Sequence, residues 1–276
     1  LTVIVSAAMA VLAALAIILL RYWLLPDIEL YHDRITAALT KAIGNTVTIG
    51  KIESDWQGLQ PHLSFVDVHI LNEQQQPALV LPRIDGSLSW MSLFAAELRL
   101  SSLEINRPEL LIRRDAQGEL FVGGMALSKQ GGDYNLADWL LHQSHILVRD
   151  ALIVWLDEQR EAPPLVLQRV NLRIESLFNR HRFALRALPP EDLAAPLDVR
   201  GNFHGASFAN LDKWHGQIFT QLEFTDVVIW QHWLDLPKEL RNGRGAVRSW
   251  LSVEAGRVTG ITADLALYNV AARLAE

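Results

Sequence analysis

The feature that most constrains the fold of this chain is an alternation of apolar and polar side chains that recurs from about residue 46 onward. A period of two places successive side chains on opposite faces of a β-strand. The alternation is clearest in the segments 84–90, 170–175, 197–203 and 261–267. It predicts a mainly β protein whose strands each have one dry face and one wet face.

Short segments rich in Pro, Gly, Asn and Asp separate these strands, among them 106–108, 115–118 and 162–164. Such residues favour tight turns, and their spacing predicts consecutive antiparallel hairpins. Helical patterns are scarce, with a short one at 135–143, so helices are too few to cover a parallel sheet. We therefore expect a long antiparallel sheet with few short helices.

A second constraint is the N-terminal run of twenty residues without a charged side chain, which is followed by two aromatic residues. A bilayer core of about 30 Å requires roughly twenty apolar helical residues, and aromatic side chains favour the membrane interface. The sequence thus predicts one transmembrane anchor within residues 1–25. The residues expected to hold this anchor in the membrane are Val3, Ile4, Val5, Val11, Leu12, Leu15, Ile17, Ile18, Leu19, Leu20, Tyr22 and Trp23.

A cleaved secretory signal is the alternative interpretation of this run. The apolar stretch is longer than a usual signal core, and the bulky segment 21–26 follows it in place of a small-residue cleavage site. We expect the anchor to be retained. Because the chain starts at Leu1 without Met, we also expect the natural N-terminus to lie upstream.

Residues 26–45 follow the pattern of a single amphipathic helix. Apolar residues recur there at intervals of three and four, and they are Ile28, Tyr31, Ile35, Leu39 and Ile43. Such a helix lies either on a membrane surface or over one end of a β-sheet, and we favour the sheet.

Composition narrows the class of protein. Half of the residues are apolar, which fits a folded chain, and the absence of Cys excludes disulfides and thiolate metal sites. The net charge of −6 comes without a block of Lys and Arg, which argues against nucleic acid as a partner. The segment 128–145 predicts a linker with a short helix between a first β-module, residues 46–127, and a second one, residues 146–276. We expect the second module to continue beyond Glu276, because its last strand has no covering segment.

None of the common catalytic or nucleotide-binding motifs occurs, so we expect neither an enzyme nor a cofactor. His142 and His145 lie near Asp138 in sequence, but no further ligand follows at a suitable spacing, and polar surface positions are the better interpretation. Asp157 and Glu158 are adjacent at a strand end, where their side chains should point apart instead of acting as an acid–base pair.

Four tryptophans are candidates for stacking on a ligand, although aromatic anchors at the ends of a core are the favoured interpretation. They are Trp214, Trp230, Trp233 and Trp250.

The dry face of such a sheet must be covered, and two solutions are open. Another sheet gives a closed sandwich, whereas an apolar ligand can lie along an open, folded-over sheet with the form of a groove. An uncovered groove would exceed the apolar surface that soluble proteins tolerate. If the sheet is open, the alternating positions expected to line the groove are Leu88, Trp90, Leu172, Ile174, Val199, Phe203, Ile218, Leu222, Leu265 and Leu267.

Several segments carry a resemblance to a known family. The segment 103–118, LEINRPELLIRRDAQG, resembles the strand-Pro-strand-Arg-Asp-x-x-Gly segment of AsmA-like proteins. The segments 150–160, 214–219 and 230–237, followed by Gly243-Arg244-Gly245 and Trp250, are similar to the YhdP branch of that family. Together the similar segments extend over essentially the whole chain.

The resemblance implies a single-pass inner-membrane protein of a diderm bacterium, with the bulk of the chain in the periplasm. A long β-groove would pass phospholipid acyl chains passively toward the outer membrane and so support its integrity, without catalytic residues, metal or cofactor. The expected partners are phospholipid, the inner membrane and a protein of the envelope or outer membrane. The alternative is a structural or assembly factor of the envelope whose closed β-domains bind protein partners.

Overall fold

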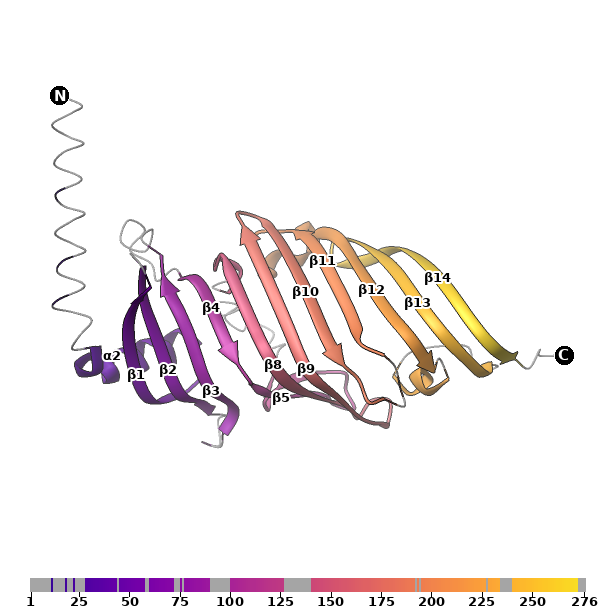
Figure 1. The fold of residues 1–276 in the computed structure, drawn as a ribbon, viewed down its shortest axis with the longest axis horizontal. Helices are drawn as coiled ribbons and strands as arrows, with labels where there is room; N and C mark the ends of the chain where they lie inside the picture. Colours follow the sequence, from indigo (N-terminus) through magenta and orange to yellow (C-terminus); the bar gives the residue numbers. More distant parts are fainter. Residues whose placement is uncertain are drawn as a thin grey trace, which may run out of the picture.

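The computed structural model of this chain describes Val11, Ile18, Tyr22 and residues 28–43, 45–57, 60–71, 75, 77–89, 100–126, 140–191, 193, 195–226, 228–233 and 240–272. Its described strands join in one 14-stranded sheet, which Figure 1 shows as a long twisted array with the first strand at one end and the last strand at the other. The prediction of a mainly β chain with a mostly antiparallel sheet is confirmed.

The first half of the sheet contains β1 (Val47–Gln57), β2 (Gln60–Leu71), β3 (Pro77–Leu88), β4 (Leu100–Asn106), β5 (Glu109–Arg114), β6 (Leu120–Val122) and β7 (Met125–Ala126). The second half contains β8 (His145–Asp157), β9 (Ala162–Leu177), β10 (Arg180–Leu188), β11 (Leu197–His204), β12 (His215–Asp226), β13 (Leu240–Glu254) and β14 (Arg257–Ala272). The helical elements are η2 (Ile28–Tyr31), α2 (His32–Ile43), η3 (Phe208–Lys213) and η4 (Ile229–His232).

Neighbouring strands are antiparallel except at one joint in the middle of the sheet. There β4 and β5 follow one another along β8, and both run parallel to it. The expectation of antiparallel hairpins throughout is wrong at this joint, because the chain returns from β7 through residues 127–144 and enters β8 in the direction of β4. Parallel neighbours require a long connection of this kind, whereas a tight turn produces antiparallel ones.

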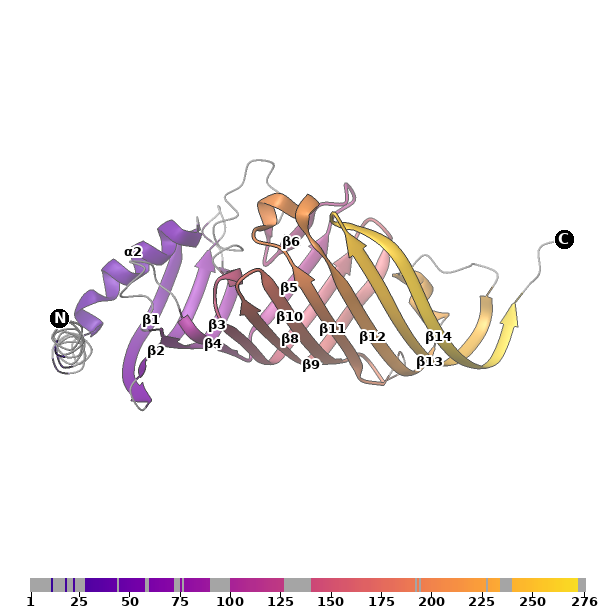
Figure 2. The same ribbon diagram turned by 90° about the horizontal axis from the view of Figure 1, so that it is seen from above.

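The sheet bends sharply along a line of β-bulges that crosses this joint. Arg107, Asp150 and Arg169, on three adjacent chain segments, all have positive φ angles, of 52°, 55° and 46°. The pairing register shifts at the same place in β8 and β9. An extra residue in one strand increases local bending and twist, so bulges on successive strands form a crease. Beyond the crease, β5 and β6 lie behind the main sheet in Figure 1 and on the same side of it as α2 in Figure 2.

Small side chains fill the inside of the crease. Ala151, Val170 and Ala187 have 0, 1 and 2 % of their surface exposed, and they form one buried cluster. The backbone closes the bend with hydrogen bonds from Arg107 N to Arg149 O, 2.8 Å, and from Leu152 N to Pro108 O, 3.0 Å. The sheet is therefore folded over by its own backbone and by the small residues at the fold.

The amphipathic helix predicted for residues 26–45 is present as η2 and α2. Its Ile28, Ile35 and Leu39 pack against a buried cluster from β1, β2 and β3. The ring of His32 lies 2.9 Å from the carbonyl oxygen of Ile49 and ties the helix to β1. The interpretation that this helix covers one end of the sheet is confirmed.

The predicted transmembrane anchor stays a prediction. Within the described residues, no helix has both the length and the apolar character needed to span a membrane. Val11 and Ile18 are helical and exposed, and Tyr22 is exposed. The other residues named for the anchor lie outside the described part, as do most residues of the predicted linker 128–145. The division into two β-modules also stays a prediction.

Candidate functional site

One face of the sheet carries apolar side chains in rows that cross from strand to strand, and we call it the apolar face. Residues paired directly across two strands point to the same side. One row contains Ile105, Val148, Leu172, Leu185 and Val199, on five strands that are neighbours in the sheet, β4 and β8 to β11. The opposite face is called the polar face.

A second apolar row runs parallel to the first and reaches the last strand. It contains Leu103, Ile146, Ile174, Phe183, Gly201, Ile218, Leu251 and Ile261. The row extends from β4 to β14 without a charged side chain. The sheet therefore presents a continuous apolar strip perpendicular to its strands.

The structure brings together eight of the ten residues that the sequence predicts for a groove. Leu172 and Val199 belong to the first row, and Ile174 and Ile218 belong to the second. The other four lie on the same face: Phe203 opposite His181, Leu222 and Leu265 on either side of Val247, and Leu267 opposite Gly245. Leu88 pairs with Leu100 at the end of β3, its side chain being outside the described part, and Trp90 lies outside the described residues. Contact of these residues with lipid stays a prediction.

Sequence reasoning missed several residues of the same face. Phe183 and Leu185 alternate with Arg182, Ala184 and Arg186 along β10, the period-two signal used for the other strands. Leu251 and Ile261 complete the second row on β13 and β14. The sequence signal that could have identified these residues is the same alternation of apolar and polar side chains, read over as few as five residues.

The cover over the apolar face changes along the sheet. At the first strands, α2 buries Val47, Ile52 and Val68 to 4 % exposure or less. At the last strand, Ile261 and Leu265 are 69 and 60 % exposed. The apolar face is thus closed under a helix at one end and uncovered on β14, among the residues that the structure describes.

Aromatic rings lie over glycines in the middle of the apolar face. A Cβ atom on Gly201 would lie 2.1 Å from the ring of Phe183, and one on Gly205 would lie 2.3 Å from the indole of Trp214. Only glycine allows these rings to approach the backbone so closely. His181 stacks on Trp214 with ring centroids 5.5 Å apart. Trp214 is therefore a structural anchor, as favoured from the sequence.

The remaining candidate tryptophans also make contacts within the protein. Trp230 and Trp233 pack edge to face with centroids 5.8 Å apart, and Trp233 Nε1 donates to Pro163 O at 3.2 Å, which ties η4 to the start of β9. Trp250 lies on the polar face against Phe219, with centroids 5.3 Å apart. The observed contacts give all of them structural roles.

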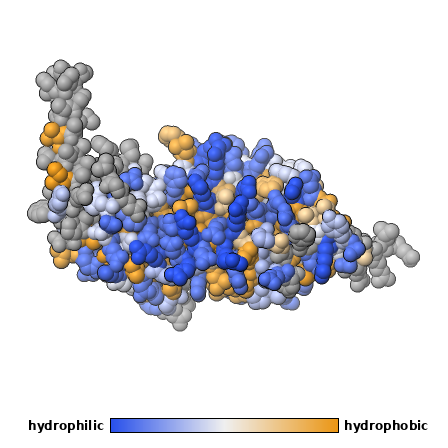
Figure 3. All heavy atoms as spheres, in the orientation of Figure 1, coloured by the Kyte–Doolittle hydropathy of each residue, from blue (hydrophilic) through white to orange (hydrophobic). Residues whose placement is uncertain are grey.

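The polar face is held together by ion pairs. Figure 3, which views this face, shows hydrophilic residues gathered over the middle of the sheet. Asp198 receives hydrogen bonds from Arg200 at 2.8 Å and Arg186 at 3.2 Å. The hydrogen bond from Arg200 is the main cause that lowers the pKa of Asp198, against the opposing effect of partial burial. Arg149 pairs with Glu104 at 2.6 Å.

The adjacent carboxylates at the end of β8 point apart, as expected. Asp157 is buried and held by Arg114, with an Nε to Oδ1 distance of 3.0 Å, whereas Glu158 is exposed and pairs with Arg113 at 3.1 Å. Burial alone would raise the pKa of Asp157, but the hydrogen bonds from Arg114 and the backbone of Arg160 lower it. This carboxylate is an ion-pair partner that remains charged.

Of the three residues considered as metal ligands, the structure describes the two histidines. His145 begins β8 and lies 3.3 Å from Ser101 O, His142 is exposed, and Asp138 lies outside the described residues. No group of three or more His, Asp or Glu side chains that could hold a metal ion occurs in the described part of the chain.

Comparison with known proteins gives one match. The family model described as YhdP protein matches residues 1–276. No curated protein and no solved structure matches the chain.

Proposed function

Because this chain belongs to the YhdP family, whose model matches its whole length, we propose that its apolar face is a passive path for the acyl chains of phospholipids. The observation that supports this most directly is the apolar strip that reaches β14, where Ile261 and Leu265 stay exposed. Apolar surface of this extent favours an apolar ligand or partner.

The path runs perpendicular to the strands. Acyl chains lie against the rows that contain Leu172, Ile174 and Ile218, while the headgroups remain in water. Burial of each CH₂ group contributes about 0.8 kcal/mol, so a chain of ordinary length is held without a polar binding site. Because the rows continue with similar chemistry from strand to strand, a bound chain meets no single deep site along the strip. Such a surface suits sliding better than storage.

The membrane context belongs to the same proposal. Residues 1–25 anchor the chain in the inner membrane, and the folded-over sheet extends into the periplasm. Lipid moves along it toward the outer membrane, in support of that membrane's integrity, and the protein has no catalytic role. The alternative function, an assembly factor whose closed β-domains bind envelope proteins, requires the apolar face to be filled by protein instead of lipid.

The decisive measurement is the phospholipid that stays bound to the full chain after purification from bacterial membranes in mild detergent, quantified by mass spectrometry. The double substitution Ile261→Asp with Leu265→Asp places two charges on exposed positions of the strip, so the fold is retained. We expect bound lipid to fall to less than half. Thr262→Asp is the matched control, because Thr262 lies between the two positions and faces the polar side.

If the purified wild-type protein carries no bound phospholipid, the result would support the alternative function as an assembly factor. Equal lipid in the wild type, the double variant and the control, with all three folded by circular dichroism, would show that lipid does not use this face.

A further inference from the structure

We propose that the polar face carries a binding site for a phosphate-bearing anion. The site is a hollow of about 840 Å³ over β8, β9, β10 and β11, and it is bordered by four arginines, Arg149, Arg173, Arg186 and Arg200. Its four arginines point to the opposite side of the sheet from the apolar strip, and Val148 and Leu172 of the first apolar row also border the hollow. The proposal therefore rests on the arginines and does not depend on the proposed lipid path.

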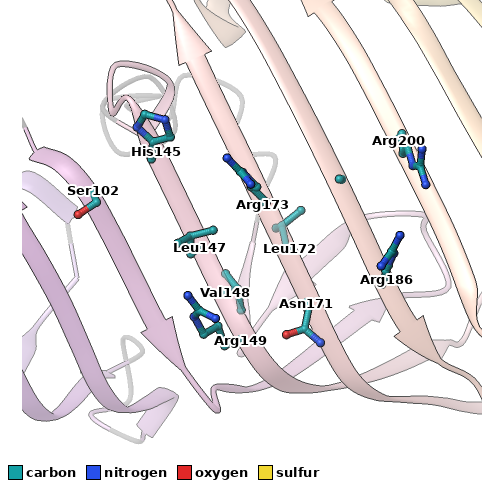
Figure 4. A pocket seen from close by; sticks show the side chains of 11 residues that line it. Ser102, His145, Leu147, Val148, Arg149, Asn171, Leu172, Arg173, Arg186 and Arg200 are labelled. Carbon is teal, nitrogen blue, oxygen red and sulfur yellow. The ribbon is translucent and has the colours of Figure 1, made fainter.

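The register of the strands creates the hollow. Arg173 on β9 and Arg200 on β11 both pair with Ala184 on the strand between them. Their Cα atoms are thus two strands apart, about 10 Å, and the methyl group of Ala184 leaves the space between them unfilled. Figure 4 shows the four arginines at the corners of the hollow, with Asn171 between the lower two.

Positive charge exceeds negative charge around this hollow. Glu104 pairs with Arg149, Glu175 pairs with Arg173, and Asp198 is shared between Arg186 and Arg200. Four guanidinium groups therefore face three carboxylates. His145 and Asn171 also border the hollow.

Donors remain for a ligand after these ion pairs are made. Arg149 reaches Glu104, and Arg186 reaches Asp198, through the Nε atom. A guanidinium carries four further N–H donors on its two terminal nitrogens. Each of these two arginines can therefore bind an anion without giving up its carboxylate partner.

The arrangement fits phosphate better than a single carboxylate. Guanidinium groups bind phosphate oxygens through two parallel hydrogen bonds, and a tetrahedral phosphate offers oxygens toward several sides of a hollow at once. Ligand pockets for small molecules span roughly 300 to 1,000 Å³. The hollow accordingly has room for two linked phosphates or for a phosphate attached to a larger group.

The test uses the full chain in phosphatidylcholine nanodiscs and inorganic pyrophosphate as the probe, measured by isothermal titration calorimetry at about 0.15 M salt, where long-range attraction is screened. We expect saturable binding that weakens at least tenfold in the double variant Arg173→Gln with Arg200→Gln. Arg182→Gln is the matched control, because Arg182 lies on the same face of β10, between Glu175 and Asn202, outside the hollow. The control should bind as the wild type does.

Competition by dihexanoyl-phosphatidylglycerol distinguishes the sources of phosphate. Displacement of pyrophosphate by this short-chain lipid identifies a headgroup ligand, and its absence identifies a free phosphate compound; both results support the site. Absence of saturable pyrophosphate binding to the wild type would overturn the proposal. Equal weakening in the double variant and in Arg182→Gln would overturn it as well, since general charge attraction would then explain the binding.

Discussion

At the scale of single residues, His181 shows how the interior of the apolar face restricts protonation. Its Nε2 atom donates to the carbonyl oxygen of Gly205 at 2.9 Å, and its Nδ1 atom, unprotonated in the neutral ring, accepts from Ser176 Oγ at 2.9 Å. Burial lowers the pKa of His181 against the hydrogen bond to Gly205, which raises it, and nearby His142 and His204 lower it further. The folded protein therefore favours the neutral imidazole.

The pH dependence of stability follows from this lowered pKa. Below about pH 6.5, the usual pKa of histidine, His181 takes up a proton more readily in the unfolded chain than in the folded one, so the unfolded state is favoured. We expect the thermal midpoint of the wild type to fall between pH 7.5 and pH 5.5, and to fall less in His181→Gln. Because the two proteins are compared by how much their thermal midpoints change with pH, the cost of the hydrogen bonds that His181→Gln loses cancels. Identical slopes in differential scanning fluorimetry would contradict the expectation.

At the scale of elements, the crease shows how backbone and small side chains bend a sheet together. Asp150 N donates to Asn171 Oδ1 at 3.3 Å, and Asn171 Nδ2 donates to Arg169 O at 2.8 Å. One asparagine thus satisfies backbone groups of two residues with positive φ. On the inside of the bend, Ala151, Val170 and Ala187 of β8, β9 and β10 form one buried cluster.

Enlarging a side chain inside the crease should therefore destabilise the sheet. Overpacking a filled core costs roughly 1 to 3 kcal/mol, and we expect a loss of that size for Ala151→Leu. Ala263→Leu is the control, because Ala263 is an exposed alanine of the apolar face, on β14. Urea unfolding of both variants tests this. A change below about 0.5 kcal/mol for Ala151→Leu would mean that the crease has spare room.

At the scale of the whole molecule, we expect local stability to be highest where the apolar face of the sheet is covered and lowest where it is exposed. The strands under α2 and those at the crease bury their apolar side chains, whereas most of β14 is exposed. Segments with few buried contacts open locally more often than the core does.

Hydrogen exchange followed by mass spectrometry measures these differences in local opening directly. We expect peptides from β14 to exchange at least tenfold faster than peptides from β2 and β9, because β14 has one paired neighbour and an uncovered apolar face. Equal protection of β14 and β2 in the isolated full chain would indicate that another part of the chain covers the last strand.

The sequence by itself determined the class of structure and the chemistry of its faces. Alternation with a period of two is a local property, so it identified the strands around Leu172, Val199 and Leu265 and predicted that their apolar side chains share a face. The amphipathic pattern of α2 was equally local. Family resemblance extended these observations to a proposed function, and the family match confirms the resemblance itself.

Tertiary structure alone decided how the strands come together. The parallel joint of β4 and β5 with β8 depends on a connection of eighteen residues, 127–144, whose path no local pattern specifies. The crease depends on bulges that coincide in space although Arg107, Asp150 and Arg169 lie far apart in sequence. The hollow of the polar face has the same origin: its arginines come from four strands, and register places them around Ala184. Pairing and register are long-range properties, set by which strands meet, and so they are not visible in any one stretch of the chain.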